Sequence, residues 1–149
     1  MAVQRTFAML KPGVLQRRIV GEIITRLERK GFRMVAMKLM RIPRELAETH
    51  YEEHREKPFF NDLTSYITSA PVVAMALEAD EVIGRLRMLC GATKVEDAAP
   101  GTIRGDFAAQ TQLNLIHASD SPESAARELG LFFDDAEFFE FEDGNANWF

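Results

Sequence analysis

Apolar residues gather along the chain in short runs that are typical of strands. Residues 6–10 form one such run, which Lys11-Pro12-Gly13 ends with turn residues. Residues 32–40 form a second predicted strand, in which three apolar side chains alternate on one side: Val35, Met37 and Leu39. Residues 72–77 are apolar without a break, which is typical of a central strand. Residues 113–117 form the last predicted strand.

Between these runs the apolar positions take helical spacing. They recur every three or four residues from Val20 and again from Val82, and a glycine, Gly31 or Gly91, is expected to end each helix. Pro43 opens a helical stretch that reaches about His54, and residues 59–68 form another short helix. Ser121 as N-cap with Pro122 after it is a strong helix start, and this helix is expected to end near Gly130.

Reduced to its core, the order of elements is β-α-β-β-α-β. This order predicts an α+β protein with a ferredoxin-like (split βαβ) antiparallel sheet covered by helices, which we expect to pack on one face. A length of 149 residues fits one domain, residues 1–149. Residues 92–111 show no period, and loops of that length are often functional. The fold alone does not identify a function, because many functions share it.

Composition narrows the class of protein. A net charge of −5 argues against nucleic-acid binding that depends on broad phosphate neutralisation. Cys90 is the only cysteine, so an internal disulfide is excluded, which suits a reducing compartment. The N-terminus does not have the pattern of a signal peptide, and no window approaches the ~20 apolar residues of a membrane span. We therefore expect a cytoplasmic protein without a membrane partner.

Candidate chemistry centres on His117, at the end of a predicted strand and just before a helix start. Helix N-termini favour phosphate, and Glu128, farther along that helix, could hold one ring nitrogen and leave the other as a nucleophile. Taken alone, His117 is more often a polar residue that closes a strand. Taken alone, Lys11 could be no more than a solvent-exposed residue at the end of a strand, and Phe59 could be an ordinary core aromatic residue.

Several motifs that occur together, in the same order and spacing as in a known family, favour functional roles for these residues. The chain resembles the nucleoside diphosphate kinase family over essentially its full length. The family signature Asn-x-x-His-Gly-Ser-Asp appears as Asn114-Leu115-Ile116-His117-Ala118-Ser119-Asp120. The other matching elements are Lys11-Pro12, His50-Tyr51, Pro58-Phe59-Phe60, Ser69-Ala70-Pro71-Val72-Val73, the set Arg87, Gly91 and Thr93, and the segment from Pro100 to Phe107.

The resemblance implies roles for these residues. His117 would attack the γ-phosphate of a nucleoside triphosphate through Nδ1 and pass it to a nucleoside diphosphate by a ping-pong mechanism. Glu128 and Ser119 would orient the imidazole, and Tyr51 would lie near the γ-phosphate path. The nucleotide would be held by phosphate contacts from Arg87, Thr93 and Arg104, by Lys11 at the transferring phosphate and the ribose hydroxyls, by Asn114 at the 3′-hydroxyl, and by Phe59 stacked on any base.

The resemblance also implies partners. Mg²⁺ would bridge the β- and γ-oxygens of ATP or another nucleoside triphosphate, with water rather than a protein cage completing its shell. The tail through Asn147-Trp148-Phe149 matches the longer form of the family and implies a homo-oligomer, with a hexamer favoured over a tetramer. One alternative is a catalytically idle nucleotide-binding regulatory module of the same fold. Another, a ferredoxin-like RNA-binding domain, is disfavoured by the acidic charge.

Several positions depart from the family pattern, among them Gly13, Ala118 and Thr111. Gly13 stands where a carboxylate is common, so the turn after Lys11 is expected to change. Ala118 replaces a glycine after the histidine, which is tolerable unless that position needs a positive φ. Thr111 stands where an apolar residue often lies against the base, which would weaken that side of the base site.

Overall fold

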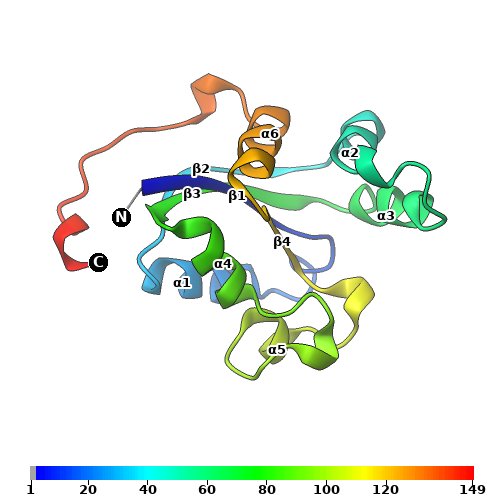
Figure 1. Cartoon of the computed structure of the whole chain (residues 1–149), viewed down its shortest axis with the longest axis horizontal. Coiled ribbons are helices and arrows are strands. Elements are labelled where there is room, and N and C mark those ends of the chain that lie inside the picture. The colour runs from blue at the N-terminus through cyan, green and yellow to red at the C-terminus, as the bar shows by residue number, and fades with distance from the viewer. Residues whose placement is uncertain (1–2) are drawn as a thin grey trace.

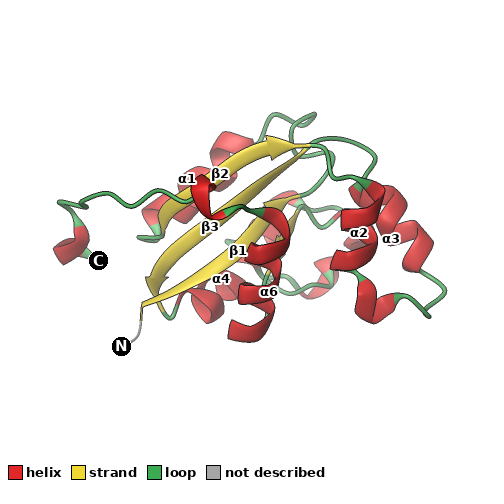
Figure 2. Ribbon diagram, turned by 90° about the horizontal axis from the view of Figure 1, so that it is seen from above, coloured by secondary structure: helices red, strands yellow, loops and turns green. Residues whose placement is uncertain are grey.

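A four-stranded sheet organises residues 3–149, the part of the chain that the computed structural model describes (Figures 1 and 2). The strand order is β2-β3-β1-β4, and every neighbouring pair is antiparallel. Because β3 lies between β1 and β2, the predicted split βαβ arrangement is confirmed. The strands are β1 Val3–Leu10, β2 Arg33–Met40, β3 Val72–Asp80 and β4 Ile116–Ala118.

Strand β1 is buried on both of its faces, which explains its continuous run of apolar residues. Ala8 and Leu10 face one apolar cluster, whereas Phe7 and Met9 face another, and all four side chains are buried. Successive side chains of a strand point to opposite faces, so a strand covered on both faces must be apolar at every position. The prediction that helices pack on one face only was therefore wrong.

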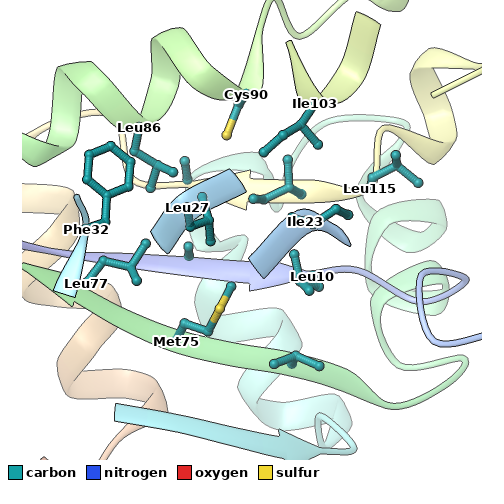
Figure 3. Packing of buried hydrophobic residues seen from close by; sticks show 14 of the residues in the cluster. Leu10, Ile23, Leu27, Phe32, Met75, Leu77, Leu86, Cys90, Ile103 and Leu115 are labelled. Atoms are coloured by element: carbon teal, nitrogen blue, oxygen red, sulfur yellow. The ribbon is translucent and has the colours of Figure 1, made fainter. Parts of the chain in front are cut away.

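The helices divide between the two faces of the sheet, as Figure 1 shows for α6 and α2 against α1, α4 and α5. The first cluster, part of which is drawn in Figure 3, joins the sheet to α1, α4 and α5. The second joins it to α2, α3 and α6. The helices are α1 Val20–Arg29, α2 Arg44–His50, α3 Phe60–Ile67, α4 Val82–Cys90, α5 Ile103–Phe107 and α6 Pro122–Phe132. Short 3₁₀ turns occupy Glu52–His54, Val95–Asp97, Thr111–Leu113, Asp135–Glu137 and Ala146–Trp148.

Strand β2 departs from the predicted alternation. Val35 is buried, but Met37 and Leu39 are exposed. The pairing register with β3 shifts between Met34 and Ala36, which is the mark of a β-bulge. One inserted residue turns every later side chain to the opposite face. The prediction that Val35, Met37 and Leu39 share one side of the strand therefore fails beyond the bulge.

Two element boundaries also differ from the prediction. The last strand begins at Ile116 rather than at residue 113, because Leu115 adopts a φ of 75° and the residues before it form a 3₁₀ turn. Helix α6 passes through Gly130 and ends at Phe132, where the buried Leu129 and Phe132 keep it packed on the sheet. Among residues 3–149, no helix is both long and apolar enough for a membrane crossing.

Candidate active site

His117 lies on the short edge strand β4, opposite Met9 of β1. Helix α6 begins at Pro122, and its start is set by Ser121, whose hydroxyl accepts a hydrogen bond from the Ser124 amide at 3.1 Å. The predicted helix start is therefore confirmed. The short link between β4 and α6 turns the helix back over β1, and it brings the side chain of Glu128 to the imidazole.

Glu128 and His117 form a direct hydrogen bond. His117 Nε2 lies 2.9 Å from Glu128 Oε2, and the Ser119 hydroxyl donates to Glu128 Oε1 at 2.5 Å. Burial acts to raise the pKa of Glu128, but the hydrogen bonds from His117 and Ser119 outweigh it and lower that pKa below its ordinary value. An ionised carboxylate only accepts, so Nε2 carries the ring proton. Nδ1 then keeps its lone pair, as a nucleophile requires.

Lys11 supplies a cation at the end of β1. Its Nζ donates to Asn114 Oδ1 at 2.8 Å, and the Asn114 amide in turn donates to the Thr93 carbonyl at 3.4 Å. Burial, assisted by the positive charge of Arg104, lowers the pKa of Lys11 to about 8. Lys11 is therefore a cation at neutral pH that an anionic ligand would hold in its charged form.

Two arginines bind the backbone on either side of His117 in the sequence. Arg87 donates to the Ala118 carbonyl at 3.2 Å. Arg104 is buried, and it donates to the backbone carbonyls of Gly91, Asn114 and Ile116. Burial lowers the pKa of Arg104. These contacts use three of the five guanidinium donors of Arg104, so it ties the long loop to β4 and retains donors for a ligand.

A cavity of about 550 Å³ opens above these groups. Eight of the ten residues predicted for the site line it: Lys11, Tyr51, Arg87, Thr93, Arg104, Asn114, His117 and Glu128. Ser119 lies beneath it, bonded to Glu128, and burial raises the pKa of Tyr51 at its wall. Phe59 stands outside the lining with 44% of its surface exposed, and its ring is 5.6 Å from that of His54, which lines the cavity.

Two further residues reach the site, and neither was predicted as a site residue: His50 and Arg127. His50 lies edge-on to His117 with ring centroids 4.9 Å apart, and its Nδ1 is 3.7 Å from Glu128 Oε2. Burial and the neighbouring His117 lower the pKa of His50 to about 3. Arg127 lines the cavity and donates to the His50 and Thr49 carbonyls. The helical spacing from Ser124 to Arg127 and Glu128 would have placed Arg127 on this face.

The departures from the family pattern at Gly13, Ala118 and Thr111 have local explanations. Gly13 adopts a φ of 102°, so a glycine suits the turn after Lys11. Ala118 is absent from the positive-φ residues of the described chain and pairs with Ala8, so its methyl group fits the strand. The Thr111 hydroxyl donates to Glu96 and accepts from the Val95 amide, which ties it to the loop.

A second cavity, of about 570 Å³, lies between the C-terminal tail and the sheet, with Gly31, Arg33 and Phe149 in its wall. Its lining among the described residues includes neither histidine nor cysteine. This second cavity is slightly larger, but the groups suited to phosphate chemistry line the His117 cavity.

Comparisons with known proteins show which family the chain is similar to. A family model described as nucleoside diphosphate kinase matches residues 4–138. The chain is 58% identical over 149 residues to the nucleoside diphosphate kinase of Treponema pallidum (strain Nichols), covering 100% of both chains. It is 56% identical over 146 residues to that of Archaeoglobus fulgidus, covering 98% of this chain and 97% of the relative.

A solved structure is similar over nearly the whole chain. It is a halophilic nucleoside diphosphate kinase from Halobacterium salinarum in complex with CDP, with a TM-score of 0.95, 49% identity, and coverage of 99% of this chain and 98% of that one. The family model covers most of the sequence, and the relatives share its length. The chain therefore belongs to the nucleoside diphosphate kinase family.

Proposed function

We propose that this chain moves the γ-phosphate of a nucleoside triphosphate to a nucleoside diphosphate through a phosphohistidine at Nδ1 of His117. As a member of its family, the chain is a phosphotransferase that acts on nucleoside di- and triphosphates. One observation carries the proposed mechanism: the 2.9 Å hydrogen bond from His117 Nε2 to Glu128 leaves the lone pair on Nδ1. The idle-module alternative has no support, since the nucleophile and its carboxylate are present and in contact.

The reaction would proceed in two matched halves. Nδ1 forms a bond to the γ-phosphorus while the bond to the β,γ-bridging oxygen breaks, and the nucleoside diphosphate leaves with that electron pair. The positive charge that develops on the imidazole is balanced by Glu128, which already accepts the Nε2 proton. In the second half, a terminal oxygen of another nucleoside diphosphate attacks the phosphohistidine, and Nδ1 leaves. A single site that serves donor and acceptor in turn gives ping-pong kinetics.

The remaining site residues would position the nucleotide. We propose that the cations and hydroxyl around His117 hold the phosphates: Lys11, Arg87, Arg104 and Thr93. Asn114, already in contact with Lys11, would hold the 3′-hydroxyl, and Tyr51 would flank the path of the γ-phosphate. Charge and alignment are what phosphoryl transfer needs from a protein beyond the nucleophile. Ser119 would act through Glu128 by fixing its carboxylate.

The family's kinase reaction uses a divalent metal, and we propose Mg²⁺. Within residues 3–149, the only group of three metal-ligating side chains contains two histidines, whereas Mg²⁺ prefers oxygen ligands in an octahedron. The ion would therefore be held by nucleotide phosphates and water. When bound there, it would neutralise charge on the β- and γ-oxygens. Lys11, Arg87 and Arg104 provide the cationic surroundings that such a complex requires.

Phe59 is the proposed base platform. Its exposed ring beside His54 offers a flat face at the edge of the cavity, and every base has a face that can stack on it. The relative from Halobacterium salinarum was solved with CDP. We expect broad base tolerance, so Phe59→Ala should weaken the binding of purine and pyrimidine nucleotides to a similar degree. A loss confined to one base would contradict the stacking role.

The oligomeric state, the domain organisation and the cellular location are also proposals. We propose a homo-oligomer, a hexamer, because the edge strand β2 exposes Met37 and Leu39, and Trp148 and Phe149 are exposed in the tail. Mass measurement by light scattering would distinguish six copies from four. We also propose that residues 1–149 form one domain, because strands from both halves of the chain share one sheet. We propose a cytoplasmic location, because a single cysteine suits a reducing compartment.

Formation of the phosphoenzyme is the direct test. The protein is incubated with γ-labelled ATP and Mg²⁺ without acceptor, and the label should appear in an acid-labile, base-stable form that any nucleoside diphosphate discharges. His117→Ala should remain unlabelled. Absence of label on the wild-type protein, or equal label on the variant, would exclude the mechanism.

A further inference from the structure

His50 poses a problem that the phosphotransfer mechanism leaves unsolved. Its side chain is 1% exposed, yet neither ring nitrogen has a hydrogen-bond partner within the described part of the chain. Buried polar groups are almost always satisfied, and each exception calls for an explanation. The Nδ1 atom points toward Glu128 Oε2 at 3.7 Å, too far for a hydrogen bond but close for two ligands of one ion.

We infer that His50, His117 and Glu128 form a binding site for a divalent transition metal of the zinc type, and that metal bound there switches off the His117 nucleophile. One ligand atom from each side chain lies within 4.8 Å of the other two. The switching-off rests on the proposed role of His117, whereas the binding itself does not.

The spacing of the ligand atoms fits a tetrahedral ion. Zinc sits about 2.0–2.1 Å from nitrogen and carboxylate oxygen, which places its ligand atoms about 3.3 Å from each other. The two distances to Glu128 Oε2 lie on either side of that value, at 2.9 Å from His117 Nε2 and 3.7 Å from His50 Nδ1. The widest separation in the group would have to close by about 1.5 Å at most.

The set of ligands also selects the metal. Two imidazoles and one carboxylate form a ligand set that zinc enzymes use, with the fourth position left to water. All three residues line the cavity, so an ion can reach them and take its fourth ligand from that side. Mg²⁺ disfavours nitrogen ligands, so the metal that accompanies the nucleotide should not occupy this site.

Inhibition follows from where the imidazole proton can reside. A neutral imidazole carries one proton and one lone pair on its two nitrogens. In the metal-free site the proton is on Nε2, bonded to Glu128, and the lone pair is on Nδ1. A metal that takes the lone pair of Nε2 forces the proton onto Nδ1. The proton count of His117 is unchanged, but the atom that should attack phosphorus no longer has a lone pair.

Calorimetric titration with Zn²⁺ alone, on the full chain without nucleotide in a non-chelating buffer, tests the site. We expect saturable binding of one ion per chain. His50→Gln should weaken it by at least about tenfold, because even loss of a residue that only supports a ligand costs 10- to 100-fold. His54→Gln is the matched control, because His54 also lines the cavity but does not belong to the group of His50, His117 and Glu128. It should bind Zn²⁺ within threefold of wild type.

Two results would overturn the site: no saturable binding at pH 7, or affinities that do not separate His50→Gln from His54→Gln. If His50→Gln does not fold, nitrogen-15 spectra of the wild-type histidines decide instead. Zn²⁺ should move the His117 proton from Nε2 to Nδ1 and shift the His50 resonances, and unchanged spectra would refute the inference. Phosphoenzyme formation without Zn²⁺ is scored separately, so failure of the proposed mechanism cannot be mistaken for failure of the metal site.

Discussion

Replacement of Glu128 by glutamine isolates the charge that orients His117. The side chain keeps its shape, and the glutamine can still accept from His117 Nε2 through a neutral oxygen, while the Ser119 hydroxyl can turn to accept from its amide. What is lost is the charge assistance of a 2.9 Å hydrogen bond, on a carboxylate with only 8% of its side chain exposed. Hydrogen bonds to charged groups contribute about 1.5–3 kcal/mol and neutral ones about 0.5–1.5 kcal/mol, so the substitution loses about 1–1.5 kcal/mol. The phosphorylation step should slow by about 5- to 13-fold, since 1.36 kcal/mol is a factor of ten.

Single-turnover quench measurements with γ-labelled ATP report this step without interference from product release. Glu123→Gln is the matched control, because it removes the same charge from the exposed first turn of the same helix. We expect Glu123→Gln to phosphorylate at the wild-type rate. A Glu128→Gln rate within threefold of wild type would refute the view that the carboxylate acts on the nucleophile.

The same substitution changes the response of stability to acid. The folded pKa of Glu128 is lowered from 4.5, so its ionised form favours the folded state. That contribution is complete above the unfolded pKa of about 4.5 and is lost as pH falls through the folded pKa. The midpoint of thermal unfolding should therefore fall less steeply below pH 4.5 in Glu128→Gln than in the wild type. Parallel curves for the two proteins would contradict the assigned direction of the shift.

Three further predictions concern other positions. With a pKa of about 8, Lys11 is charged below that pH and neutral above it, so kcat/KM should decline as pH rises through 8, and Lys11→Arg should move that decline to higher pH. Arg104→Met leaves three backbone carbonyls without their donor and should cost about 3 kcal/mol, seen as a fall of roughly 6–12 °C in the calorimetric Tm; a change under 2 °C would exclude this. Ala118→Gly should lower stability by about 0.5–1 kcal/mol in denaturant titration without raising the turnover rate, because Ala118 needs no positive φ.

Local signals in the sequence predicted much of the fold. The central strands were identified because they are apolar at successive positions, and α6 because Ser121 and Pro122 mark its start. The bulge in β2 was not predictable from the alternation of apolar residues, because it has no residue pattern of its own. It nevertheless reverses which of the later side chains face outward. The early end expected at Gly130 was overridden by packing of Leu129 and Phe132, a tertiary effect.

The site was predicted from motifs in register, and geometry added what the motifs do not contain. Sequence placed Glu128 near His117 as a hypothesis, and the hydrogen bond between them now assigns the ring proton to Nε2. The involvement of His50 was not predictable, because it depends on how α2 packs against α6 across the sheet face. The motif His50-Tyr51 marks this position in the sequence, but it does not show that the His50 ring lies against His117 and Glu128.

Phe7 connects the core to the chemistry. Its ring is fully buried in β1, stacked on Phe132 at 4.5 Å between centroids, and 5.8 Å from the ring of His117. A fluorine label on this ring would report each phosphorylation of His117 from inside the molecule, without touching a nucleotide. For engineering, Phe7 is a core position at which a change of volume would displace the nucleophile, so redesign for thermostability should leave this side chain as it is.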